Sequence, residues 1–281
     1  MTINCNGQLI DLTTPKVMGI LNVTPDSFYD GGNFQNQNKI MHHVDKMLSD
    51  GAAFIDVGAY SSRPGAEHIS ESEELQRLIP VIKLLVKTFP NILISVDTFR
   101  SNIAKQSIDN GACMINDISA GTLDANMMST VANLHVPYIM MHMKGTPQTM
   151  KQLAQYGHLV KDVLFYFSEK IAAARALEIV DMIVDPGFGF AKTTAQNFEL
   201  LNHLELFQPL ELPILTGLSR KSMIYKTLDS SSKDALNGTS VLNTIALQKG
   251  ASILRVHDVK EAVECVKLME VLKHNGVVQR P

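Results

Sequence analysis

Eight short runs of apolar and β-branched residues recur along the chain, and each is followed by turn residues and then by a segment with helical spacing. Repeated strand-then-helix units are typical of an α/β fold with a parallel sheet. Eight units predict a single (β/α)8 barrel domain over residues 1–281, with a doubly wound open sheet as the alternative. The expected strands are 17–21, 53–57, 92–96, 113–115, 137–141, 182–184, 213–216 and 252–255.

The segments between these strands carry signals for the starts and ends of helices. Apolar residues in 75–86 repeat at intervals of three and four, and the preceding segment 70–73 contains the acids that stabilise a helix N-terminus. Gly51, Gly111 and Gly250 each stand shortly before an expected strand, where a helix ending requires positive φ. The order helix, glycine, strand is therefore expected to repeat.

Composition narrows the class of protein. Hydrophobic residues make up 45% of the chain, which is enough for a sizeable core. The chain has 25 Lys and Arg and 28 Asp and Glu, and its basic residues do not form a stripe. Nucleic acid is therefore not an expected partner. No apolar run approaches the ~18 residues of a membrane span and the N-terminus lacks a leader pattern, which predicts a cytoplasmic protein with no membrane partner. Cys5, Cys113 and Cys265 lie far apart without a C-x-x-C pair, which predicts reduced thiols.

Polar residues stand at or just after the expected strands. In a barrel the carboxyl ends of all strands surround one mouth, where active sites lie. A single Asp or Asn after a strand is commonly a turn or cap residue, but equivalent residues on so many strands favour a shared site. The set is Asn22, Asp56, Asp97, Asn116, His142, Asp185, the run 219–222, Arg255 and His257.

Two acids of this set are the most informative. Asp97 and Asp185 would repel one another and lose hydration in a narrow mouth unless a donor-rich group bound them. Together with the amide of Asn116 they would suit the amino-pyrimidinone edge of a fused heterocycle. The alternative is that these acids form internal salt bridges with Lys221 and Arg255.

Arg255 and His257 after the last strand predict an anion site, because barrels often bind phosphate near strands seven and eight. The run 216–222 lacks the glycines of a Walker A loop, and 187–190 lacks the third glycine of a dinucleotide fingerprint. Nucleotide hydrolysis and hydride transfer therefore lose support. Zinc-hydrolase histidine pairs and a serine elbow are absent from the sequence, which leaves Lys221 as a minor option for covalent catalysis.

Long segments follow the first two expected strands, at 22–32 and 61–66, and both are rich in glycine and proline. Long loops in compact domains are often lids, and Phe28 on the first would suit closure over a ligand. The alternative is a disordered surface loop.

Taken together, these motifs resemble the dihydropteroate synthase family, the pterin-binding TIM barrels of the folate pathway that sulfonamides block. The resemblance extends along the whole chain, and its motifs together are highly specific. They are the segments 21–28, 62–65, 95–98, 115–117, 141–143, 185–190, 219–222 and 255–258.

The resemblance implies a transferase that joins 6-hydroxymethyl-7,8-dihydropterin pyrophosphate to para-aminobenzoate with Mg²⁺, releasing pyrophosphate. It also implies roles for residues of this sequence. The pterin contacts would be Asp97, Asn116, Asp185 and Lys221, and the pyrophosphate contacts Asn22, Ser62, Arg255 and His257, with Asn22 on the metal. The aminobenzoate contacts would be Phe28, Arg63, Pro64, Phe190, Lys221 and Ser222. The catalytic residues would be Asp97, Asp185, Lys221, Arg255 and His257.

The implied chemistry needs no strong base, because an arylamine is already a neutral nucleophile. We expect a dissociative substitution in which cations neutralise the departing pyrophosphate and the two acids favour the cationic pterin methylene. Ser62 stands where the family commonly has Thr, which preserves the hydroxyl. A homodimer is expected from the resemblance to this family alone. The alternatives are a pterin-binding methyltransferase that serves a corrinoid carrier and a non-enzymatic binding barrel.

Overall fold

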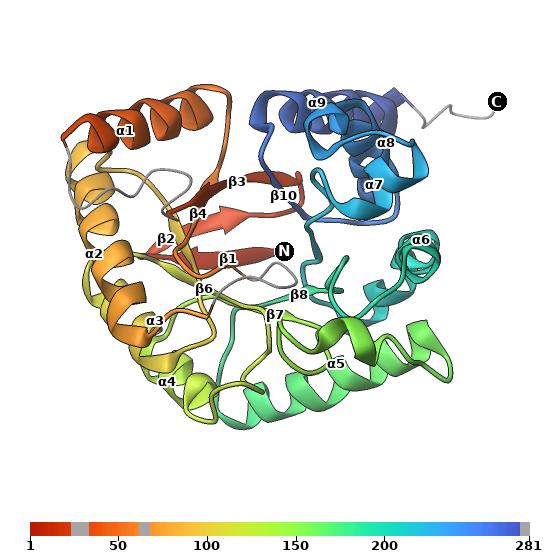
Figure 1. Ribbon diagram of the computed structural model, residues 1–281, viewed down its shortest axis with the longest axis horizontal. Coiled ribbons are helices and arrows are strands. Elements are labelled where there is room, and N and C mark those ends of the chain that lie inside the picture. The colour runs from red at the N-terminus through yellow and green to blue at the C-terminus, as the bar shows by residue number, and fades with distance from the viewer. Residues whose placement is uncertain (24–33, 62–67, 276–281) are drawn as a thin grey trace.

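A barrel of eight parallel strands forms the centre of the computed structural model, which describes residues 1–23, 34–61 and 68–275 (Figure 1). The sheet order is β8-β7-β6-β5-β4-β3-β10-β9, and a parallel bridge between Val184 and Ile214 joins its two ends. The predicted (β/α)8 barrel is therefore confirmed. The strands are β3 (Lys16–Asn22), β4 (Phe54–Gly58), β5 (Ile94–Asp97), β6 (Met114–Asp117), β7 (Tyr138–Met141), β8 (Met182–Asp185), β9 (Leu215–Thr216) and β10 (Ile253–Val256).

Helices surround the strands and cover the outer face of the barrel (Figure 1). They are α1 (Phe34–Ser49), α2 (Glu71–Thr88), α3 (Ser101–Asp109), α4 (Met127–Leu134), α5 (Leu159–Ala176), α6 (Thr194–Asn202), α7 (Ser222–Thr227), α8 (Leu236–Gln248) and α9 (Val259–Asn275). Short 3-10 turns lie at η1 (Met150–Leu153), η2 (Leu204–Leu210) and η3 (Ser232–Asp234). This layering buries one apolar face of each helix against the sheet.

The helix α2 shows how sequence sets these boundaries. The Ser70 hydroxyl accepts a hydrogen bond from the Glu73 amide at 3.2 Å and so satisfies a backbone donor that the first turn leaves unpaired. Leu78, Ile82 and Leu85 lie on one face and are fully buried. The predicted helix is confirmed, and its spacing of apolar residues directs that face at the barrel.

Three glycines end helices as predicted. Gly51, Gly111 and Gly250 have φ of +102°, +104° and +98°, which a residue with a Cβ adopts only with strain. At Gly111 a Cβ would also come within 2.9 Å of Val86 on α2. The chain can therefore turn tightly from helix to strand at these positions.

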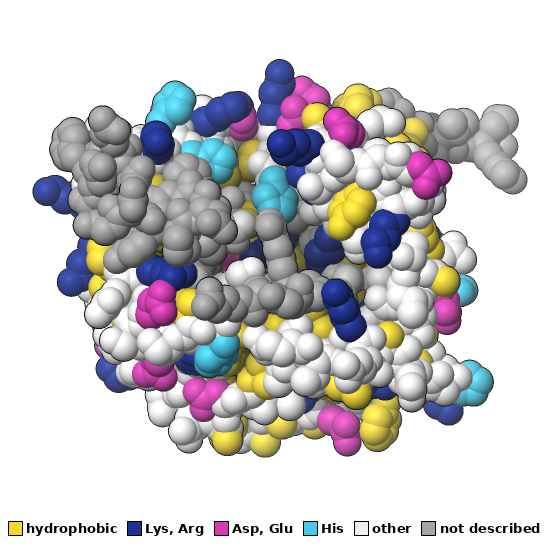
Figure 2. Space-filling model, in the orientation of Figure 1, with side chains coloured by type: hydrophobic (Ala, Val, Ile, Leu, Met, Phe, Trp, Pro, Cys, Tyr) yellow, Lys and Arg dark blue, Asp and Glu magenta, His cyan; other side chains and the backbone are white. Residues whose placement is uncertain are grey.

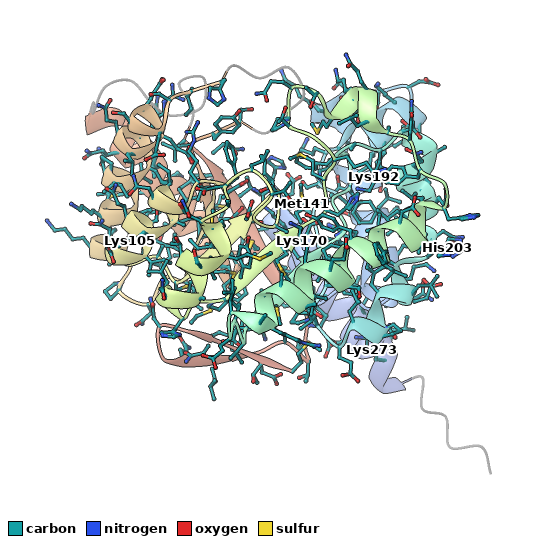
Figure 3. All side chains as sticks on the ribbon, turned by 90° about the horizontal axis from the view of Figure 1, so that it is seen from below. Lys105, Met141, Lys170, Lys192, His203 and Lys273 are labelled. Atoms are coloured by element: carbon teal, nitrogen blue, oxygen red, sulfur yellow. The ribbon has the colours of Figure 1, made fainter. Side chains whose placement is uncertain are left out.

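An N-terminal hairpin closes the end of the barrel opposite the site and was not among the expected elements. It consists of β1 (Thr2–Cys5) and β2 (Gln8–Asp11), paired antiparallel, and it lies at the bottom of the view in Figure 3. Ile3 packs in a cluster with Met18 and Phe54, which point to the amino-terminal end of the barrel. Asn6 and Gly7 have φ of +52° and +80°, so the Asn-Gly pair was the available sequence signal.

Two expectations drawn from composition can be compared with the structure. Cys5, Cys113 and Cys265 are buried and carry free thiols, which confirms that they contribute packing rather than disulfides. Within the residues that the structure describes, no helix is both long enough and apolar enough to cross a membrane.

Candidate active site

The strand register brings the predicted polar residues into one row at the carboxyl end of the sheet. Asn22 on β3 pairs with Gly58 on β4, Gly58 pairs with Asp97 on β5, and Asp97 pairs with Asn116 on β6. Further round the barrel, the last residue of β7 pairs with Asp185 on β8. Asn22, Asp97 and Asn116 thus lie in one row on three strands, and Asp185 lies at the carboxyl end of a fourth, as the barrel prediction required.

The guanidinium of Arg255 reaches from β10 to two carboxylates. Its Nε donates to Asp56 Oδ2 at 2.6 Å and its Nη2 to Asp97 Oδ2 at 2.7 Å. Asp56 is fully buried and also accepts from Asn116 Nδ2 at 3.0 Å and from the Ser95 hydroxyl at 2.6 Å. The proposed internal salt bridge is therefore confirmed for Arg255, and Asp56 is the residue that holds Arg255 and Asn116 in place.

Asp56 belongs to the predicted ring of strand-end residues but not to the predicted substrate contacts. Its fully buried carboxylate cannot itself face a ligand, because three hydrogen bonds from Ser95, Asn116 and Arg255 already surround it. Asp97 differs, because its side chain is 14% exposed and the Arg255 guanidinium contacts only its Oδ2 oxygen. A carboxylate has about four acceptor positions, so Asp97 can hold Arg255 and still accept from a ligand.

Burial and charge oppose one another at Asp97. Removal from water raises the pKa of its carboxyl above the ordinary value, while the adjacent Arg255 guanidinium lowers it and Asp56 raises it again. The cost of charging this acid makes a ligand that donates N–H groups to it favourable. The floor of the mouth is therefore prepared for a donor-rich heterocycle rather than for an anion.

Lys221 and Asp185 form the opposite side of the mouth. The Lys221 ammonium donates to the Phe188 carbonyl and lies 5.0 Å from the centroid of the Phe190 ring. Asp185 accepts from the Gly187 amide at 2.8 Å. Burial lowers the pKa of Lys221 to about 8, with Asp185 opposing the shift, and burial raises the pKa of Asp185 with Lys221 opposing. The two groups stabilise each other's charge without a direct salt bridge between them.

The run 219–222 is tied to the segment after β10. Arg220 has φ of +54° and binds Asp258 in a two-pronged ion pair at 2.8 and 2.9 Å. Its Nη1 donates to the carbonyls of Ser232 and Lys233, and its amide donates to the Thr239 hydroxyl at 3.0 Å. A strained backbone held by this many contacts is typical of functional loops. The arrangement fixes where Lys221 and the start of α7 lie.

Lys192 was not expected in the site and lies in the half of the barrel away from the hairpin (Figure 3). Its ammonium contacts His142 Nδ1 at 2.9 Å and donates to the carbonyls of Gly187 and Phe190 at 3.0 and 3.1 Å. Burial lowers its pKa to about 7, opposed by Asp185. His142 is buried, and burial followed by Lys192 lowers its pKa to about 2, so its ring is a neutral acceptor. This cluster fixes the loop that carries Phe190.

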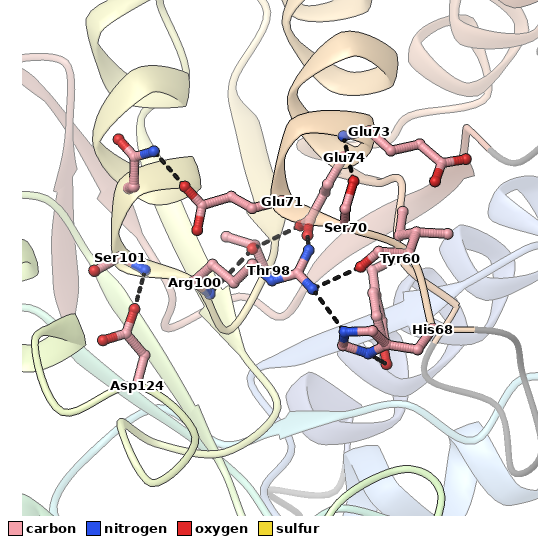
Figure 4. A network of polar contacts seen from close by, with 12 residues as sticks. Tyr60, His68, Ser70, Glu71, Glu73, Glu74, Thr98, Arg100, Ser101 and Asp124 are labelled. Carbon is pink, nitrogen blue, oxygen red and sulfur yellow. Dashed lines mark hydrogen bonds and ion pairs between the residues drawn. The ribbon is translucent and has the colours of Figure 1, made fainter.

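A buried ion pair supports the loop that follows β5 (Figure 4). The Glu74 carboxylate accepts from Arg100 Nη1 at 2.5 Å and from the Thr98 hydroxyl at 2.8 Å. Arg100 Nη2 also donates to the Ile69 carbonyl at 2.7 Å. Burial raises the pKa of Glu74, while Thr98 and Arg100 oppose that shift. These contacts hold the residue next to Asp97 and the start of α2 together.

Some of the remaining predicted residues lie at the site, and others fall outside the residues that the structure describes. Ser222 is the first residue of α7, and Phe190 lies beside Lys221. His257 follows β10 and contacts Ser219. Four predicted contacts fall outside the described residues, namely Phe28, Ser62, Arg63 and Pro64.

The charge of this face suits an anionic ligand beside the heterocycle. Figure 2 shows several Lys and Arg side chains near the centre of the face viewed there. Across the described parts of the chain, no cluster of three or more His, Cys, Asp or Glu side chains could hold a metal by itself.

Comparison with known proteins agrees with this geometry. Residues 18–257 match the model of a family described as pterin binding enzymes. The dihydropteroate synthase of Escherichia coli (strain K12) is 41% identical over 272 residues, which cover 96% of each chain. The Yersinia pestis dihydropteroate synthase, solved with a sulfonamide drug complex, is 40% identical with a TM-score of 0.91, covering 98% of this chain and 100% of that one. The Xanthomonas albilineans enzyme, solved with 4-aminobenzoic acid, is 37% identical with a TM-score of 0.89, covering 97% and 98%.

Proposed function

The chain belongs to the pterin-binding enzymes of the dihydropteroate synthase family, and on that basis we propose the reaction it performs and the residues that perform it. The protein is a transferase of folate synthesis. It joins 6-hydroxymethyl-7,8-dihydropterin pyrophosphate to para-aminobenzoate, forming 7,8-dihydropteroate and releasing pyrophosphate. The observation that carries the assignment of residues is the ring of acids, amide and lysine at one barrel mouth.

The pterin lies on Asp97, Asn116, Asp185 and Lys221. The two carboxylates accept from the amino-pyrimidinone N–H groups, and both are costly to charge in the empty site because burial raises their pKa. A neutral heterocycle that offers N–H donors reduces that cost. The Lys221 ammonium interacts through its charge with both Asp185 and Asp97, which supports its place beside these acids.

The pyrophosphate lies towards Arg255 and His257, with Asn22 and Ser62 as further contacts. Asn22 ends β3 at the level of Gly58 and Asp97, so its amide oxygen can share a magnesium ion with phosphate oxygens and water. Mg²⁺ is usually held by one or two protein oxygens plus substrate phosphates, which fits a site with a single amide donor. When bound, Mg²⁺ would neutralise charge on the leaving pyrophosphate.

The para-aminobenzoate lies beside Phe190, Lys221 and Ser222, with Phe28, Arg63 and Pro64 contributed by the two undescribed segments. The Lys221 ammonium lies 5.0 Å from the Phe190 ring centroid, which leaves an aromatic and a cationic surface side by side. Ser222 offers a hydroxyl and a backbone N–H to the carboxylate. Sulfonamides, as analogues of this substrate, would bind in the same pocket.

The substitution is dissociative, so the groups of the protein act mainly on charge. Arg255 and His257 neutralise negative charge that develops on the departing pyrophosphate. Asp97 and Asp185 favour the positive charge that develops on the pterin methylene. The neutral arylamine then attacks, and its proton leaves to solvent, so no buried side chain has to act as a strong base.

The reaction can be tested by mixing the purified protein with the pterin pyrophosphate, para-aminobenzoate and magnesium and measuring dihydropteroate. We expect product only when all three are present, so chelation of magnesium should stop its formation. Absence of product despite pterin binding would favour the methyltransferase or the non-enzymatic alternative, and methyl transfer to a corrinoid would separate those two.

The pH dependence of pterin binding should report on Lys221. Because burial lowers the pKa of this group to about 8, its ammonium is present below that pH and is lost above it. We expect the affinity for the pterin to fall as pH rises through about 8, measured by isothermal titration calorimetry. Lys221→Arg keeps its charge at all these pH values, so its affinity should show no such fall. An equal fall in both proteins would contradict the role of Lys221.

The proposal extends to the oligomeric state of the protein and its location in the cell. We place the protein in the cytoplasm as a homodimer. Val241 on α8 and Leu268 and Leu272 on α9 are 51%, 72% and 63% exposed, and we propose that these apolar side chains contact a second copy of the chain. Light scattering should give twice the 31.0 kDa mass of one chain.

A further inference from the structure

The Lys192 side chain is partly buried, and its ammonium uses its donors on the protein itself. An ammonium has three N–H donors and no acceptor position. Those of Lys192 meet His142 Nδ1 at 2.9 Å, the Gly187 carbonyl at 3.0 Å and the Phe190 carbonyl at 3.1 Å. Three donors are thus matched by three acceptors, so a direct contact with a substrate would require one of these bonds to break.

Two of these acceptors are the ends of one tight turn, residues 187–190. The Phe190 amide donates to the Gly187 carbonyl at 3.1 Å, and Gly189 between them has φ of +81°. A positive φ at the third residue is typical of a type II turn, which favours glycine there. Lys192 binds the carbonyls of the first and fourth residues of this turn. Both backbone groups of Phe190 therefore depend on Lys192, the carbonyl directly and the amide through Gly187.

The turn also lies against the segment that follows β7. A Cβ at Gly187 would overlap the His142 carbonyl, so only glycine allows this close approach. Ala191, next to the turn, has φ of +46°, and its carbonyl accepts from the Tyr156 hydroxyl at 2.9 Å. Lys192 adds its contact with the His142 ring. The segments after β7 and β8 are therefore joined by an ammonium, a hydroxyl and a close backbone contact.

The turn carries the aromatic ring of the proposed aminobenzoate pocket. The Phe190 ring centroid lies 5.0 Å from the Lys221 ammonium, and Lys221 donates to the Phe188 carbonyl in the same turn. Two ammonium groups thus hold three of the four carbonyls of the turn. Removal of Lys192 would release the carbonyl on each side of that bond and leave the Phe190 ring less firmly placed.

We propose that Lys192 is a positioning residue for para-aminobenzoate, because it closes the turn 187–190 and so holds the Phe190 ring beside Lys221. This inference rests on the proposed function for the identity of the substrate. Since its donors are already bound, Lys192 does not act on the reacting atoms. The binding of the aromatic amine should therefore depend on it, and the chemical step should not.

Kinetics of Lys192→Met test this division. The substitution removes the ammonium and keeps the length of the side chain. The assays are carried out below the pKa of about 7 that burial gives Lys192, where the unmodified side chain is charged. The KM for para-aminobenzoate should rise about tenfold, as expected for one lost hydrogen bond to a charged group, while kcat changes little. The affinity for a pterin, measured by calorimetry, should also change little.

A double-mutant cycle with Phe190→Ala separates positioning from a general loss of structure. If Lys192 acts through the ring, Lys192→Met should raise the KM less than about twofold in a protein that already lacks the ring. Lys170→Met is the matched control, since Lys170 on α5 is also partly buried and is labelled with Lys192 in Figure 3. Its ammonium donates to the Thr122 hydroxyl at 2.9 Å, and its substitution should leave the KM unchanged.

Hydrogen exchange measured by mass spectrometry tests the turn without any substrate. The amides of residues 187–190 should exchange about tenfold faster in Lys192→Met, and those of α8 should not. The role of Lys192 would be overturned by unchanged exchange at the turn or by an equal rise in α8. Equal KM changes with and without the Phe190 ring, or a greater loss of pterin affinity than of aminobenzoate affinity, would also overturn it.

A failure of the proposed function is a different result, since the unmodified protein would then form no dihydropteroate. Hydrogen exchange would in that event decide whether Lys192 holds the turn, and the role towards para-aminobenzoate would be excluded.

Discussion

Replacement of Arg255 by alanine should lower the rate of dihydropteroate formation about a hundredfold or more, as removal of a single oxyanion donor does in other enzymes. The guanidinium is the strongest cation at the expected position of the leaving pyrophosphate. The same substitution should also destabilise the protein, because Asp56 and Asp97 would lose their shared partner. Breaking a buried ion pair by removal of one member costs about 3–5 kcal/mol.

Steady-state kinetics and urea unfolding measure these two effects separately. Arg255→Lys keeps the charge but cannot bind two carboxylates with a planar fork, so it should lose less stability than the alanine variant and still lose activity. Near-full activity of Arg255→Ala, in a protein that remains folded, would exclude Arg255 from the reaction.

Asp185→Asn should abolish pterin binding while leaving the free energy of unfolding nearly unchanged. Burial raises the pKa of this carboxyl, so its charge is tolerated rather than favoured in the empty site. An asparagine oxygen can still accept from the Gly187 amide, which the carboxylate does at 2.8 Å. Because the pterin no longer binds and the charge that favours the cationic methylene is lost, activity should fall by more than about a hundredfold.

Asp181→Asn is the matched control, because Asp181 directly precedes β8 at the opposite end of the barrel. Among the described residues, its carboxylate accepts a hydrogen bond only from the Asn4 amide of the hairpin, at 3.0 Å. Calorimetry with a pterin should show normal affinity for Asp181→Asn and none for Asp185→Asn. Equal affinities in the two variants would remove Asp185 from the site.

The barrel could be predicted from the chain because its strands are buried on both faces. A buried parallel strand such as β7 is a continuous apolar run, whereas the helices between the strands have apolar residues at intervals of three and four. The polar strand ends were predictable for the same reason, since their place follows from where each run stops. The hairpin escaped prediction because only its Asn6–Gly7 pair signals it, on short strands with exposed positions.

The pairing inside the mouth could not be predicted from the same patterns. Arg255 and Asp56 are 199 positions apart, and they meet only because β10 closes the barrel next to β3. Nothing in the sequence around Lys192 distinguishes it from a surface lysine, yet the turn at Gly187 directs its ammonium to two carbonyls and a histidine. Such contacts depend on closure of the whole fold rather than on local sequence.

A crystal structure with a bound pterin analogue and pyrophosphate would test the central assignment most directly. The heterocycle should lie within hydrogen-bond distance of Asp97, Asn116, Asp185 and Lys221, with the anion against Arg255 and His257. A pterin bound elsewhere, or one that leaves Asp97 and Asp185 without contact, would contradict the assignment.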